Sequence, residues 1–195
     1  MPELPAPKRL RFAKEYGLAP EQIEILVIDR PLANYFEAVA SELAASSSVA
    51  MTKEGLYLLA INYLSSDLKG LMALAGISDP IQTKINPENF SDLILLVASE
   101  KINSRVAKDI LKKMFDEGGD PTEIMRSSGL EQVSDEGALV PIAEQLIAAN
   151  PGPVADYKNG KEAALMFFVG QAMKALKGKG NPAVLQKIFK ELLTK

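Results

Sequence analysis

Residues 165–192 read LMFFVGQAMKALKGKGNPAVLQKIFKEL and specify two helices joined by a tight turn. Apolar side chains recur every three or four residues on each side of the turn, which is the spacing of a helix with one buried face. Within the turn, Gly178 fits the left-handed position after a helix end, Asn181 fits a helix cap and Pro182 fits a first helical position. The two stripes consist of Leu165, Phe168, Val169, Ala172 and Leu176, then Val184, Leu185, Ile188, Phe189 and Leu192.

The same helical spacing covers most of the remaining chain. Ile102, Val106, Ile110 and Met114 recur every four residues, and residues 139–146 carry a similar stripe. No run alternates apolar and polar residues between hairpin turns, which is the pattern of a half-buried strand. We therefore expect an all-α fold.

Helix boundaries carry the expected capping residues. Residues 120–123 (DPTE) offer an acidic cap, a proline at the first helical position and a glutamate at the third. Ser134 is expected to cap a helix that runs to about residue 149, where Asn150 and Pro151 stop it. Gly118 fits the residue after a helix end.

The organisation along the chain suggests two helical units. Residues 76–89 carry no apolar stripe, and Pro80 and Pro87 interrupt any helix there. We therefore expect a helical domain over residues 1–75, a linker over 76–89 and a multi-helix tail domain over 90–195. The linker is expected to let the tail swing.

The amino-acid composition limits the kinds of site that the chain can form. The 195 residues are 47% hydrophobic and 24% charged, as in ordinary globular proteins. The absence of cysteine excludes disulfides and thiolate metal sites, and the absence of histidine excludes the usual general base and the Ser-His-Asp triad. Residues 1–5 do not resemble a signal peptide, and the apolar runs are far shorter than the roughly 20 residues that span a bilayer. We expect a cytoplasmic protein that does not contact membranes.

The charges are unevenly distributed. From residue 151 onward, 8 basic residues face 3 acidic ones, which gives +5, whereas residues 1–150 carry −8 within the overall −3. A basic tail on an acidic body favours an acidic partner, nucleic acid first.

The turn is the centre of the basic segment. Its glycines have a structural explanation, because Gly178 can end one helix while Asn181 and Pro182 begin the next. The functional interpretation is that Gly178 and Gly180 allow close approach of a phosphate, with lysines around them and an exposed helix amide end adding affinity. The lysines concerned are Lys174, Lys177 and Lys179, with Lys158 and Lys161 as secondary candidates.

The other motifs give weaker indications of function. Tyr157, Phe167 and Phe168 are candidates for base stacking, but Phe168 falls on the apolar stripe and is expected in the core, while Tyr157 stays open. The sequence holds no Walker nucleotide loop, and no pair of carboxylates stands out as an acid/base couple or a metal cage. We expect no catalytic or metal-binding residue.

Several of these motifs also carry a family resemblance. Residues 156–161 (DYKNGK), 170–174 (GQAMK) and 178–182 (GKGNP) resemble the end of the YqeY-like domain, and residues 101–108 (KINSRVAK) and 118–121 (GGDP) resemble its start. That domain ends the B subunit of the aspartyl/glutamyl-tRNA amidotransferases. Gly180 stands where we expect alanine or another small residue in relatives.

The first 85 residues favour the B subunit over a free-standing YqeY-like protein. Residues 2–5 (PELP), 29–36 (DRPLANYF) and 60–64 (AINYL) resemble the helical domain that precedes the tail in that subunit. The family's large N-terminal domain, which binds ATP and Mg²⁺ and phosphorylates the misacylated tRNA, has no counterpart here. The chain is therefore expected to be a C-terminal fragment that itself needs no cofactor.

The resemblance implies a function for the tail. In the family it contacts the outer corner of tRNA(Gln) or tRNA(Asn), and the complete enzyme is a ligase of protein biosynthesis that also contains A and C subunits. We therefore expect a non-catalytic tRNA-recognition arm, in which Lys174, Lys177 and Lys179 contact phosphates. A helical protein-interaction module or scaffold is the alternative, and ATP turnover by this chain alone would indicate an enzyme.

Overall fold

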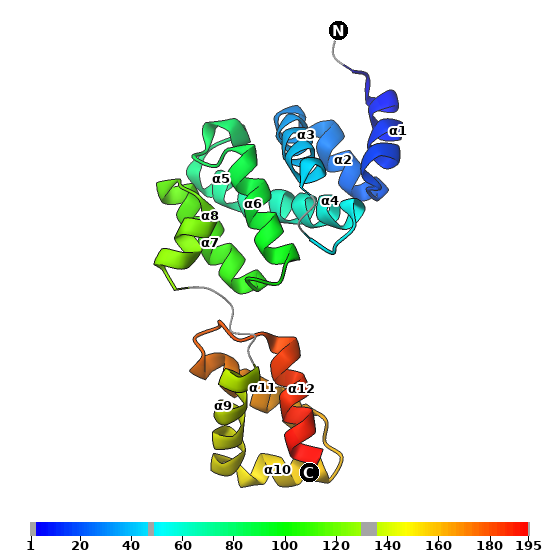
Figure 1. Cartoon of the computed structure of the whole chain (residues 1–195). Helices are drawn as coiled ribbons and strands as arrows, with labels where there is room; N and C mark the ends of the chain where they lie inside the picture. Colours follow the sequence, from blue (N-terminus) through cyan, green and yellow to red (C-terminus); the bar gives the residue numbers. More distant parts are fainter. Residues whose placement is uncertain (1–2, 47–48, 130–135, 195) are drawn as a thin grey trace. The chain divides into compact units, whose positions relative to one another are not determined.

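The structure is a computed structural model that describes residues 3–46, 49–129 and 136–194. Its contacts divide the chain into two compact units, residues 1–129 and 130–195 (Figure 1). All elements of the described residues are helical, which confirms the all-α prediction. None of the described helices is long and apolar enough to cross a membrane.

The first unit contains eight α-helices, one π-helical turn and one 3₁₀ turn among its described residues. They are α1 (Pro5–Tyr16), α2 (Pro20–Ile28), α3 (Arg30–Ala45), α4 (Lys53–Asn62), η1 (Tyr63–Leu68), α5 (Lys69–Ala75), η2 (Pro80–Gln82), α6 (Pro87–Ala98), α7 (Ser104–Glu117) and α8 (Pro121–Ser127).

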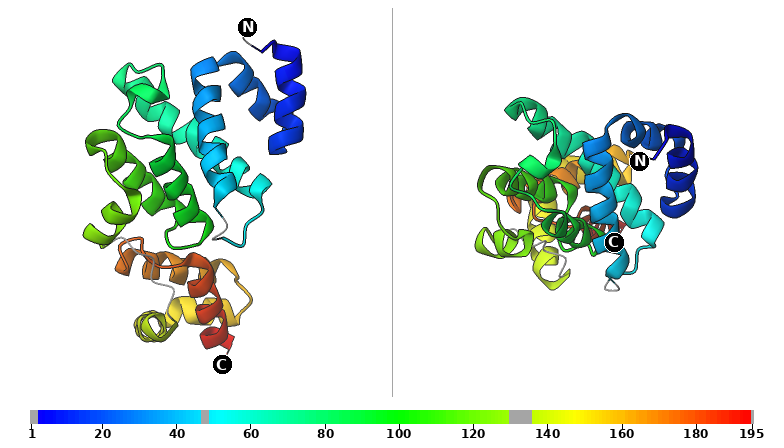
Figure 2. Two further views of the ribbon diagram at one scale, coloured as in Figure 1. Left: turned by 45° about the horizontal axis from the view of Figure 1, so that its top comes forward. Right: turned by 90° about the horizontal axis from the view of Figure 1, so that it is seen from above.

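Helix α3 is the central element of this unit and packs against α2, α4 and α6 (Figures 1 and 2). Its buried face carries Phe36, Val39 and Leu43, all of them inaccessible to solvent. The helix begins at a strong cap, because the Asp29 carboxylate accepts a hydrogen bond from the Leu32 N–H at 3.1 Å. The predicted cap at Asp120 is likewise confirmed, since its carboxylate accepts from the Glu123 N–H at 2.8 Å.

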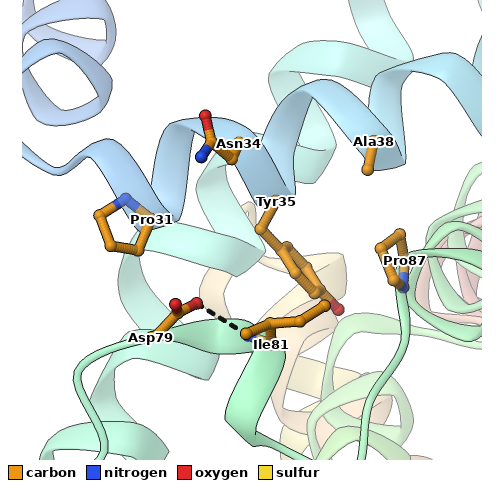
Figure 3. A pocket seen from close by; sticks show the side chains of 7 residues that line it. All are labelled: Pro31, Asn34, Tyr35, Ala38, Asp79, Ile81 and Pro87. Atoms are coloured by element: carbon orange, nitrogen blue, oxygen red, sulfur yellow. Dashed lines mark hydrogen bonds between the residues drawn. The ribbon is translucent and has the colours of Figure 1, made fainter. Parts of the chain in front are cut away.

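The segment predicted as a linker is packed against α3. Ile85 is 1% exposed, and the buried Tyr35 hydroxyl donates a hydrogen bond to its carbonyl oxygen at 3.0 Å. Figure 3 shows the Tyr35 ring reaching from α3 toward this segment beside Ile81, where a pocket of about 230 Å³ lies. In that pocket, the Asp79 carboxylate already accepts from the Ile81 N–H at 3.0 Å.

The boundary between the two compact units therefore differs from the predicted domain boundaries. Residues 76–129 belong to the first unit, whereas the sequence interpretation assigned 76–89 to a linker and 90–129 to the tail. The physical reason is that α6 buries Phe90, Leu93 and Ile94 in the same unit as α3, against which it packs. A swing of the tail about residues 76–89 has no support in this packing.

The second unit is built from four helices among its described residues: α9 (Glu136–Ala149), α10 (Pro151–Lys158), α11 (Ala163–Ala175) and α12 (Pro182–Thr194). The predicted end of α9 before Asn150 is confirmed, but the cap predicted at Ser134 lies outside the described residues. Phe168 is fully buried and stacks on Phe189 at 5.4 Å between ring centroids, which confirms its assignment to the core. The turn between α11 and α12 lies at the end of the unit opposite α10 (Figure 1).

Candidate nucleic-acid interface

Hydrogen bonds within the chain close the turn after α11 onto the end of that helix. The Gly178 N–H donates to the Met173 carbonyl oxygen at 2.7 Å, and the Lys179 N–H donates to that of Leu176 at 3.0 Å. These bonds close the carbonyl end of α11, and Gly178 has the positive φ, +82°, that the sequence predicted. Lys177 also has a positive φ, +52°, which is uncommon for a residue with a side chain. The turn therefore has a fixed shape.

Helix α12 begins at Pro182 with Asn181 as its cap, as predicted. The Asn181 side-chain oxygen accepts hydrogen bonds from the Ala183 N–H at 3.0 Å and the Val184 N–H at 3.3 Å. Pro182 has no N–H to offer. The amide end of this helix is thus occupied within the chain, and the expected contribution of free amides to anion binding is not available. Direct hydrogen bonds to a phosphate at this turn are therefore expected from the lysine side chains, while the dipole of α12 still favours negative charge nearby.

The two glycines of the turn lie inside rather than on the surface. Gly178 and Gly180 are both buried. A methyl group at Gly180 would lie 2.7 Å from Leu176 Cδ1 and 2.8 Å from Leu185 Cδ1. Gly180 is therefore explained by the close packing of two leucines, and a phosphate approach at either glycine stays a prediction.

Three lysines surround this turn. Lys174 and Lys177 are exposed and Lys179 is half-buried. Within the described part of the chain, none of the three pairs with an acidic side chain. Three positive charges within six residues on a fixed turn create a local positive potential that attracts anions.

The secondary lysines lie apart from this turn. Lys158 and Lys161 precede α11, whereas the turn follows it, and the 13 residues of α11 span roughly 20 Å. Lys161 pairs with Asp156 at 2.8 Å. Lys158 lines a pocket of about 500 Å³ together with Tyr157 and Glu162. The structure thus brings together Lys174, Lys177 and Lys179 but not the other two.

In the first unit, by contrast, several basic side chains are held by acidic ones. Arg11 pairs with Glu3, Glu37 and Glu15 at 2.7, 2.6 and 3.1 Å, and the hydrogen bonds that it donates to these carboxylates, that to Glu3 first, raise its pKa above the ordinary value. Lys108 pairs with Asp67 at 2.8 Å. Such neutralised groups attract RNA less than the lysines of the turn do.

The chain matches known proteins over almost its whole length. The profile of the GatB domain matches residues 34–193. The B subunit of the aspartyl/glutamyl-tRNA(Asn/Gln) amidotransferase from Geobacillus thermodenitrificans is 37% identical over all 195 residues, which span 38% of that relative. The B subunits from Rickettsia canadensis and Rhodospirillum rubrum are 37% and 38% identical over 193 residues, or 99% of this chain and 37% of each relative. Because the profile covers well over half of the sequence, we conclude that the chain belongs to the GatB domain family.

Proposed function

We propose that this chain is the tRNA-recognition arm of a tRNA-dependent amidotransferase and that its second unit contacts the RNA. The observation that carries the proposal is the cluster of Lys174, Lys177 and Lys179 on one rigid turn, without acidic partners among the described residues. The names of the relatives indicate that the RNA is a tRNA, since each is a subunit of an aspartyl/glutamyl-tRNA(Asn/Gln) amidotransferase.

Lysines on a fixed turn suit the recognition of a folded RNA. Such RNAs are recognised largely by shape and phosphate contacts, so a few correctly spaced cations suffice without side chains that read base edges. In the complete enzyme this arm would hold Glu-tRNA(Gln) or Asp-tRNA(Asn) while the misacylated end is amidated elsewhere. ATP and Mg²⁺ would bind outside this chain, and the A and C subunits would join through the complete subunit.

A protein contact is the second candidate, and it concerns the first unit. Ile28 and Leu74 are 82% and 90% exposed, and Ile28 borders a pocket of about 600 Å³ that Ile25 and Lys69 also line. Ile28 and Ile25 line this pocket together, and an apolar surface of this kind is suited to contact with a protein when it is contiguous. The first unit would then act as a spacer that docks on a protein, and complex formation without tRNA would support this role.

The test of RNA recognition is the salt dependence of binding. The full chain is titrated with unmodified tRNA(Gln) and with a non-substrate tRNA at several salt concentrations. If the three lysines of the turn each neutralise one phosphate, log affinity should fall with log salt at a slope of about −2 to −3. A slope near zero would refute the proposal.

Matched double variants locate the contact. Lys174→Ala/Lys179→Ala should reduce affinity at least tenfold and make the slope shallower by about 1.5. Lys53→Ala/Lys190→Ala removes the same charge from two exposed lysines that also have no acidic partner among the described residues, and is the control. Equal losses in both double variants would mean that net charge alone acts and that the turn is no specific site.

A further inference from the structure

Helix α11 presents an exposed strip on the side opposite its buried stripe. Phe167, Gly170 and Lys174 form this strip at spacings of three and four residues, which places them on one helix face. All three are exposed, whereas Phe168 and Ala172 on the other face are fully buried. The strip leads along α11 directly to the lysine-bearing turn.

Gly170 has no structural explanation in the part of the chain that the structure describes. It lies in the interior of α11, where glycine destabilises a helix relative to alanine. A Cβ atom added there would meet nothing within 4 Å, in contrast to the crowded Gly180. The helix therefore has a bare stretch of backbone that its own packing does not require. An interior glycine of this kind is useful where another molecule approaches the backbone closely.

Phe167 provides an aromatic surface at one end of the bare stretch. Its side chain is 39% exposed, and its ring meets the ring of Phe168 edge to face at 5.5 Å, which orients it. Its neighbour Met166 is 58% exposed. An exposed, oriented ring can stack on a nucleobase of any identity.

We propose that the strip Phe167–Gly170–Lys174 is an RNA-contact surface that continues the lysine turn. A nucleobase stacks on Phe167, the sugar-phosphate backbone crosses Gly170, and a phosphate pairs with Lys174. RNA is favoured over a protein because the strip ends among lysines without acidic partners in the described residues, within a segment of net charge +5. This inference rests on the proposed function and names the surface that performs it.

The decisive variants block the strip without removing charge. Gly170→Ala and Gly170→Gln should raise the unfolding midpoint, because each replaces glycine by a better helix former. Both should weaken tRNA(Gln) binding, glutamine more strongly because its side chain covers the bare backbone. Phe167→Leu keeps an apolar side chain but loses the ring, and should weaken binding roughly 5- to 20-fold.

The matched control is Gly70→Ala in α5. Gly70 is also an exposed helical glycine with nothing within 4 Å of an added Cβ, but it lies in the first unit. This variant should gain stability in the same way and bind tRNA(Gln) like the unmodified chain. A gain of stability with a loss of affinity only at Gly170 would support the strip as the contact surface.

The outcomes separate this inference from the proposed function. If Lys174→Ala/Lys179→Ala loses binding while Gly170→Gln and Phe167→Leu bind normally, the lysines contact RNA but Phe167 and Gly170 do not, which overturns the inference alone. If the unmodified chain fails to bind tRNA at low salt, the proposed function fails first. If Gly170→Gln instead disrupts a complex with another amidotransferase subunit and leaves tRNA binding intact, the strip is a protein surface and the inference is wrong.

Discussion

Replacing Asn181 by alanine should destabilise the second unit by removing the cap of α12. The Asn181 side-chain oxygen holds the Ala183 N–H at 3.0 Å and the Val184 N–H at the longer distance of 3.3 Å, so alanine leaves two amides without partners. Lost caps cost about 0.5–2 kcal/mol. Ala183 is exposed, so water can reach its amide and limit the loss. We therefore expect a destabilisation of about 1 kcal/mol, or roughly a fivefold larger open population.

The aspartate variant provides the matched comparison. Asn181→Asp keeps an oxygen acceptor in place, and its negative charge is favourable at a helix N-terminus. Its stability should therefore exceed that of Asn181→Ala, although the burial of Asn181 penalises the charged carboxylate. The same charge lies close in sequence to Lys177 and Lys179, so tRNA affinity should fall in this variant although the fold is preserved.

Hydrogen exchange measured by mass spectrometry is the appropriate assay. Because the chain has two compact units, one global unfolding curve would mix their transitions. Peptides from α12 should exchange about fivefold faster in Asn181→Ala, while peptides from α3 in the first unit report unchanged protection. Unchanged α12 protection would refute the assigned cap, and an equal loss in Asn181→Asp would show that the acceptor oxygen is not the stabilising group.

Three further predictions concern the first unit. Asp92→Asn should stabilise the fold at pH 7 by up to about 0.5 kcal/mol, because burial and then the nearby Asp120 raise the pKa of this carboxyl. The cost of ionising Asp92 in the folded state grows as the pH rises above about 3.9, the pKa of an unperturbed aspartate. Urea titrations should therefore find no gain in stability below about pH 4. Gly118→Ala should cost about 1–3 kcal/mol, since φ +81° with ψ −169° excludes most side chains, and the unfolding midpoint of this unit should fall accordingly. Tyr35→Phe loses the buried bond to Ile85 and should cost about 1 kcal/mol, seen as faster amide exchange in residues 79–86; unchanged exchange there would show that this contact does not hold the segment.

Much of the fold follows from local sequence patterns. The stripe from Ile102 to Met114, the cap at Asp120 and the positive φ of Gly178 after α11 were all predicted, because each depends on residues within one or two helical turns. Such features are set by helical periodicity and by the hydrogen-bonding needs of helix ends. The three lysines that the structure gathers on one turn were predictable for the same reason.

The sequence by itself therefore determined the all-α class, several helix ends, the excess of positive charge after residue 150 and the family of the chain, but not that Pro80 and Pro87 each begin a helical element. Only the tertiary structure decided that Ile85 packs under Tyr35, that Gly180 makes room for two leucines, and that Lys158 and Lys161 lie away from the turn. It also decided that an added Cβ at Gly170, unlike one at Gly180, would meet none of the described residues within 4 Å. These outcomes depend on side chains distant in sequence or on which face of a helix finds a partner, and helical spacing alone does not encode that choice.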